Sequence, residues 1–250
     1  MTGGHYLLVG PVRHDDEWGP LRRIQARTEI GRHEVSPGDI GGWITIDGSA
    51  QLSGRGWVAD DAVLCGSARV THEAVLEDSA VASDDASLSG RAVVGGTSRV
   101  GGRARVAGHA SVGDRARVLG SATLRGYSSV QGDAHCAGGI ELGGDVVLTG
   151  FTHLIGDAVI TDHGQMLVIG PYGRQGISVS FFRSRRGELL ASCSLAHGAA
   201  LTVLAELQAP ADEYAEPVIS AHRAEVLRQL IRAEFRLDRY SGGTVRHLST

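Results

Sequence analysis

Arginine and histidine side chains recur at every eighteenth position in the middle of this chain. A guanidinium group binds a carboxylate or phosphate through two parallel hydrogen bonds, and a protonated imidazole adds positive charge. Stacked on one surface, such groups would bind an anionic ligand or protein partner, although they would equally suit a solvated surface that only aligns neighbouring coils. The candidate ligand-binding residues are Arg99, Arg117, His135, His153, Arg103, Arg105 and Arg115.

The two histidines of this series could also belong to a metal site. His135 and His153 occupy successive places in the series, but no His-x4-His pair occurs anywhere in the chain. A zinc site needs at least a third protein ligand with suitable geometry. Cys136 is at an inward position of the repeat described next, where a cysteine acts as a small apolar residue. We therefore expect no metal.

The regular interval has a structural meaning because the chain repeats in hexads, and three hexads make one interval. From Ile46 to Ile160 an aliphatic-type residue returns at each sixth position, with a mostly small residue two positions before it and mostly Gly or Asp two positions after. Alternate strand residues share a face, so the first two classes point inward, whereas Gly and Asp suit corners. The predicted fold class is mainly β: a single-stranded, left-handed parallel β-helix of hexapeptide repeats, three to a coil.

The segments on either side of the repeat should cover its two open ends, because exposed strand edges invite unwanted pairing. We divide the chain into an N-terminal β cap (1–45), the β-helix (46–162), a small α+β domain (163–240) and a flexible tail (241–250). The α+β domain should contain three short strands, in QMLVIG, ISVSFF and ELLASC, and two helices near 199–207 and 220–237. The second helix has an amphipathic pattern that needs a core to pack on.

A second series at the same interval is apolar or small, although it occupies outward positions. A contiguous apolar stripe on a monomer is unusual and favours a packing surface. We therefore expect a homo-oligomer, with a trimer as the first candidate. The candidate interface residues are Trp57, Val75, Val93, Ser111, Ser129 and Val147.

Composition narrows the classes of partner. The formal net charge is −4 and the isoelectric point about 6.2, so nucleic acid is not a favoured partner. No run approaches the length of a membrane span, and the first ten residues do not resemble a signal peptide. Three scattered cysteines do not suggest a disulfide framework. We expect a reduced, cytoplasmic protein without a membrane partner.

The residues before the first coil resemble a known family. The theme Gly-Asp-Ile-Gly-Gly-Trp, at 38–43, is similar to that of YdcK-like hexapeptide β-helix proteins of bacteria and phages. The run from IGPYGRQG to LAHG resembles the small α/β domain of phage-borne members, where Cys-Gly-Cys-Phe usually follows the last strand; this chain has Cys193, Ser194, Leu195 and Ala196 there. The resemblance implies the β-helical architecture and a phage- or particle-associated structural protein as one alternative function.

A hexapeptide-type acyltransferase is the other alternative. It would use acyl-CoA, with His109 or His135 as the catalytic base. Such enzymes usually carry a protruding loop near the base, and the unbroken repeat supplies none. The preferred interpretation is therefore a non-enzymatic binding or assembly scaffold, without a cofactor, that presents its arginine and histidine face to an anionic ligand or protein partner.

Overall fold

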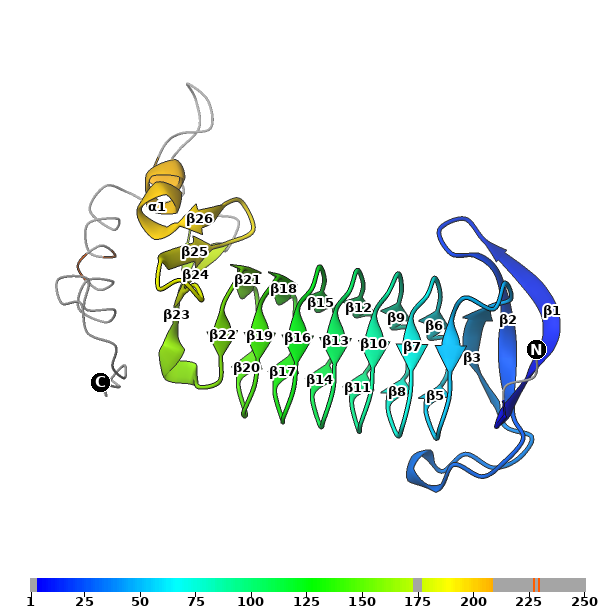
Figure 1. Ribbon diagram of the computed structural model, residues 1–250. Coiled ribbons are helices and arrows are strands. Elements are labelled where there is room, and N and C mark those ends of the chain that lie inside the picture. Colours follow the sequence, from blue (N-terminus) through cyan, green and yellow to red (C-terminus); the bar gives the residue numbers. More distant parts are fainter. Residues whose placement is uncertain (1–3, 173–176, 209–226, 228, 230–250) are drawn as a thin grey trace.

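The computed structural model describes residues 4–172, 177–208, 227 and 229. Three parallel sheets run along a rod, with an N-terminal hairpin at one end and a small antiparallel sheet with a helix at the other (Figure 1). The predicted mainly β fold with stacked parallel coils is confirmed. No helix among these residues is long and apolar enough to cross a membrane.

Each of the three sheets contributes one outward face of the rod. Face A is the outer side of the first sheet, which continues into the N-terminal hairpin: β1 (Tyr6–Asp15), β2 (Gly19–Ala26), β3 (Ile40–Thr45), β6 (Val63–Leu64), β9 (Val81–Ala82), β12 (Arg99–Val100), β15 (Arg117–Val118), β18 (His135–Gly138) and β21 (His153–Gly156). Face B belongs to β4 (Gln51–Leu52), β7 (Arg69–Val70), β10 (Ser87–Leu88), β13 (Arg105–Val106), β16 (Thr123–Leu124), β19 (Glu141–Leu142) and β22 (Val159–Ile160). Face C belongs to β5 (Trp57–Val58), β8 (Val75–Leu76), β11 (Val93–Val94), β14 (Ser111–Val112), β17 (Ser129–Val130) and β20 (Val147–Leu148).

Corners between the strands use Gly and Asp as the sequence predicts. Asp78 adopts φ 58°, and its carboxylate accepts a hydrogen bond from the amide of Gly96 in the next coil at 2.7 Å. Gly96 itself has φ 67°, and a Cβ there would lie 2.6 Å from the carbonyl oxygen of Asp114. An Asp corner is therefore held to the coil above it by its own side chain, whereas a Gly corner permits the close stacking.

The inward positions form one continuous core. From Leu52 to Ile160 the predicted aliphatic series is buried, and Leu124, for example, is fully shielded from solvent. The predicted start at Ile46 is wrong, because Ile46 is exposed and Ile44 takes the inward place, paired with Leu64. The first coil is longer than the regular coil of three hexads because its first rung belongs to the cap.

The N-terminal cap and the β-helix share strand β3. This strand pairs antiparallel with β2 and parallel with β6, so no boundary separates the two parts at residue 45. Gly41 and Gly42 are needed because the strand approaches the first coil closely. A Cβ on Gly42 would lie 2.6 Å from the carbonyl oxygen of Ala62, and one on Gly41 would overlap the carbonyl of Val58. Close backbone approach explains the paired glycines before Trp43.

The C-terminal part has one strand more than predicted. Its sheet contains β23 (Met166–Tyr172), β24 (Ile177–Arg183), β25 (Leu189–Ser192) and the short β26 (His197–Ala199), which leads into α1 (Ala200–Gln208). Helix α1 confirms the predicted helix near 199–207. The second predicted helix and the tail lie outside the described residues, apart from Leu227 and Gln229. Phe182 joins the core of the rod, so this sheet covers the last coil.

Candidate anion-binding face

The predicted ladder of basic side chains exists on face A. Successive rungs pair Val81 with Arg99, Arg99 with Arg117, Arg117 with His135, and His135 with His153. Parallel in-register pairing stacks their Cα atoms at the strand spacing, about 4.8 Å. The three-hexad interval therefore predicts this alignment correctly. The surroundings of each rung, however, differ in ways that the repeat does not encode.

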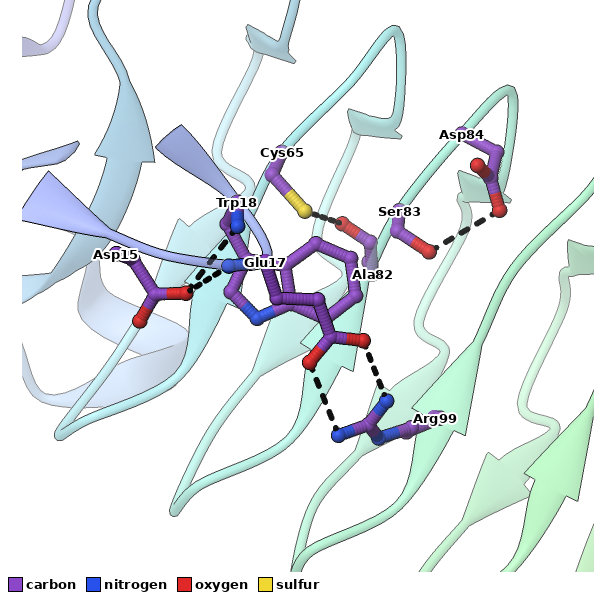
Figure 2. A network of polar contacts seen from close by, with 8 residues as sticks. All are labelled: Asp15, Glu17, Trp18, Cys65, Ala82, Ser83, Asp84 and Arg99. Atoms are coloured by element: carbon purple, nitrogen blue, oxygen red, sulfur yellow. Dashed lines mark hydrogen bonds and ion pairs between the residues drawn. The ribbon is translucent and has the colours of Figure 1, made fainter. Parts of the chain in front are cut away.

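The turn between β1 and β2 covers the lower rungs of face A (Figure 2). Trp18 packs against a buried cluster of Leu21, Val63, Cys65 and Val81, which explains why two valines occupy outward positions. The turn is held in shape by Asp15, whose carboxylate accepts the backbone amides of Glu17 and Trp18, each at 3.1 Å.

Arg99 is consequently not a free ligand-binding residue. Its guanidinium donates to both carboxylate oxygens of Glu17, at 2.9 and 3.4 Å, and lies 5.6 Å from the centre of the Trp18 ring (Figure 2). About half of each charged side chain remains exposed, at 48% and 53%, so the pair is open to exchange with solvent or another anion. The cap supplies an acidic and an aromatic side chain to the first arginine of the ladder.

Arg117 occupies the next rung and is exposed. Among the described residues no acidic group forms an ion pair with its guanidinium, in contrast to Arg99. Figure 1 shows the β1–β2 turn near the N-terminal end of face A and the C-terminal sheet next to β21, with β15 between them. Contacts of β21 with β24, β25 and β26 support this arrangement. Arg117 thus lies on a rung between the two caps.

The two histidines are half-buried, and their rings meet edge to face at 5.6 Å between centroids. Nε2 of His135 and Nδ1 of His153 are shielded from solvent and have no hydrogen-bond partner among the described residues. Burial, followed by the charge of Arg117, lowers the pKa of His135. Burial, followed by His135, lowers the pKa of His153. Both rings are therefore less protonated than a free imidazole, which is half protonated at about pH 6.5.

The remaining predicted arginines are distributed over other surfaces. Arg115 lies at a corner and forms a bidentate pair with Asp133, with both N–O distances 2.6 Å, so it is already neutralised. Arg105 projects from face B, and Arg103 stands at the corner between faces A and B; both are exposed. The structure therefore does not unite all seven predicted residues, and Arg99, Arg117 and His135 form the accessible part of face A.

The predicted self-association stripe on face C is partly covered within the chain. Trp57 and Val75 are 3% and 4% exposed, and the Trp57 ring lies against Gly41 of the cap. The segment that contains the Ile30–Val35 bridge belongs to the same buried cluster. These outward apolar residues are therefore explained by the N-terminal cap. Val93 and Ser111 remain half-buried and Val147 is exposed.

Among the described residues the cysteines are shielded from solvent and the potential metal ligands do not cluster. All three cysteines are free and buried, and burial raises the pKa of Cys136 to about 12. The described residues contain no group of three His, Cys, Asp or Glu side chains placed to share a metal ion. His109 stacks on the exposed Tyr127, with ring centroids 4.7 Å apart, at a corner of the rod.

One charged cluster was missed by the sequence analysis. Glu73 forms ion pairs with Arg32, Arg55 and Arg91 at the corner between faces B and C. The three-hexad interval that joins Arg55, Glu73 and Arg91 could have revealed part of it. The contribution of Arg32 could not be foreseen, because it comes from the cap.

Comparison with protein-family models and curated proteins identifies no relative of this chain. The resemblance of residues 38–43 to YdcK-like proteins therefore remains a prediction from the sequence, and the functional argument rests on the geometry described above.

Proposed function

We propose that the protein is a non-enzymatic β-helical scaffold that binds an acidic segment of a protein partner on face A. The observation that carries the proposal is the exposed Arg117, which lies on a rung between the caps without an acidic partner among the described residues. A guanidinium with free donors is suited to grip a carboxylate bidentately.

The chain's own turn supports this class of partner. Glu17 and Trp18 engage Arg99 through a carboxylate and an aromatic ring on the rung directly beside Arg117. A partner segment that carries an acidic and an aromatic residue would make the same contacts one rung further along. Leu119, half-buried beside Arg117, offers apolar contact area.

The two alternatives receive less support from the site. For an acyltransferase, His109 and His135 would need a neighbouring acid or carbonyl to orient the imidazole, as general bases usually have. Among the described residues His109 stacks on Tyr127, and Nε2 of His135 has no partner. A phage- or particle-associated structural role remains compatible with a binding scaffold and is distinguished from it by the formation of a defined particle.

A synthetic peptide with repeated Glu-Trp pairs tests the proposal. Fluorescence anisotropy should show binding that weakens with salt and is reduced about tenfold by Arg117→Gln, since each bidentate ion pair contributes strongly. Arg105→Gln on face B removes the same charge and should leave binding nearly unchanged. Equal binding by wild type and Arg117→Gln would refute the proposed site.

A further inference from the structure

The charged cluster around Glu73 surrounds a shallow hollow of about 440 Å³ at the corner between faces B and C. Its walls are Gly54, Arg55, His72, Glu73, Gly90 and Arg91. This hollow is remote from the Arg99–Arg117 ladder, which faces outward from another sheet. It therefore calls for an explanation separate from the proposed function.

Positive charge exceeds negative charge in this cluster. The carboxylate of Glu73 lies 3.0 Å from Nε of Arg91, 3.5 Å from Nη1 of Arg32 and 3.7 Å from Nη1 of Arg55. Three guanidinium groups thus share one carboxylate. Each guanidinium has five N–H donors in a fixed fork, so donors of Arg55 and Arg91 remain for a second anion. Arg55 is also 74% exposed.

Backbone amides at other corners of the rod show that a corner can bind an anionic group. The carboxylates of Asp78, Asp84 and Asp114 accept the corner amides of Gly96, Gly102 and Gly132, at 2.7 to 2.8 Å. The fold therefore positions corner N–H groups to donate hydrogen bonds to an anionic oxygen of the coil below. At the hollow, Gly54 lies one coil below His72, and His72 lies one coil below Gly90. Neither Gly54 nor His72 carries a carboxylate that could accept the amide above it.

Among the described residues no acceptor is bonded to the amides of His72 and Gly90. Backbone N–H groups without an internal acceptor contribute to anion-binding concavities in many proteins. Two amides and two guanidinium groups around one hollow require a ligand with several acceptor oxygens. A phosphate group supplies three or more, whereas a carboxylate supplies two.

We propose that this hollow is a second, independent binding site that accepts a phosphate group. Its oxygens would receive hydrogen bonds from the amides of His72 and Gly90 and from the free donors of Arg55 and Arg91. Glu73 is a positioning residue that holds the arginines around the hollow.

Orthophosphate, added to the full-length protein at low ionic strength, tests the site. Titration followed by nuclear magnetic resonance should shift the amide signals of His72 and Gly90 at millimolar phosphate. The double variant Arg55→Gln/Arg91→Gln should weaken binding at least about tenfold. The control Arg69→Gln/Arg105→Gln removes the same charge from face B and should bind as the wild type does. All four side chains are exposed, so both variants should keep the wild-type melting temperature.

Phosphoserine in a parallel titration identifies the source of the phosphate group. Tighter binding of phosphoserine indicates a phosphorylated molecule as the ligand, and tighter binding of orthophosphate indicates the free ion. Absence of amide shifts at His72 and Gly90, or an equal loss of binding in the two double variants, would overturn the proposal.

Discussion

Faces A and B are built from the same hexad repeat, yet their arginines have different surroundings. On face A, Arg99 and Arg117 occupy adjacent rungs between the N-terminal turn and the C-terminal sheet. On face B, Arg69 and Arg105 are two rungs apart, separated by Ser87. The difference indicates that an arginine becomes a candidate for recognition through its neighbours and the caps, since the repeat presents similar residues on both faces.

The largest expected effect concerns the core that both faces share. Leu124 is fully buried beneath face B, so Leu124→Ala should cost about 2–5 kcal/mol of unfolding free energy by removing contacts and leaving a cavity. Arg105→Ala on the outer side of the same sheet should cost under about 0.5 kcal/mol. Denaturant unfolding measures both values. Similar losses in the two variants would show that the inward and outward assignments are wrong.

Removal of the cap contact should affect face A alone. Trp18→Ala takes away a half-buried ring from the cluster of Leu21, Val63, Cys65 and Val81, and the lost apolar burial should cost about 1–2 kcal/mol. The substitution should also loosen Glu17 from Arg99 and strengthen binding of the Glu-Trp peptide. Glu17→Gln should strengthen it with little change in stability, because the ion pair is exposed. Unchanged peptide affinity in both variants would show that the β1–β2 turn does not compete with the peptide for face A.

Acid should weaken the protein through the histidines of face A. Burial lowers the folded-state pKa of His135 and His153, so the unfolded chain binds protons more readily than the folded protein. Their contribution is fully present above the unfolded pKa, about 6.5, and is lost as the pH falls below it towards the folded-state values. His135→Gln/His153→Gln should flatten this part of the stability profile. An unchanged profile would mean that the imidazoles are hydrated in the folded state.

The lowered pKa values of His135 and His153 also predict a pH dependence of peptide binding. Protonated imidazoles would favour an anionic partner, but they form only below the pH at which free histidine titrates. Peptide binding by the wild type should therefore strengthen at a pH lower than about 6.5, and the double Gln variant should lose this increase while keeping its salt dependence.

Self-association through face C is expected to be the smallest effect. With Trp57 and Val75 covered by the cap, the exposed Val147 is the accessible apolar residue of the predicted stripe. If a second copy packs there, Val147→Asp should convert oligomers to monomers without unfolding the rod. Light scattering that finds a monomeric wild type at micromolar concentration would end the homo-oligomer hypothesis.

Acyl-CoA provides a negative test of the alternative enzyme. We expect neither acetyl-CoA binding by calorimetry nor acyl transfer. If the wild type binds acetyl-CoA and His109→Gln or His135→Gln abolishes this binding, the acyltransferase function would replace the scaffold function as the better explanation.

The sequence predicts the parts of this fold that depend on local periodicity. Buried Leu124, the corner at Asp78 and the alignment of Arg99 with Arg117 all follow from the hexad. The caps can be predicted as elements, but their contacts cannot. Glu17 pairs with Arg99, which is distant in the sequence, and no repeat constrains such a pairing. The outward valines and Trp57 are apolar, which indicates that another part of a protein covers them. The repeat alone does not tell whether the cap or a second copy of the chain does so.

Hydrogen–deuterium exchange with and without the Glu-Trp peptide tests the central claim most directly. The account predicts new protection in Arg99–Val100 and Arg117–Val118, strands β12 and β15 of face A, and none in Arg105–Val106, strand β13 of face B. Arg117→Gln should abolish that protection. Protection of β13 equal to that of β12 and β15, or protection that survives Arg117→Gln, would contradict a specific acidic-segment site between the caps.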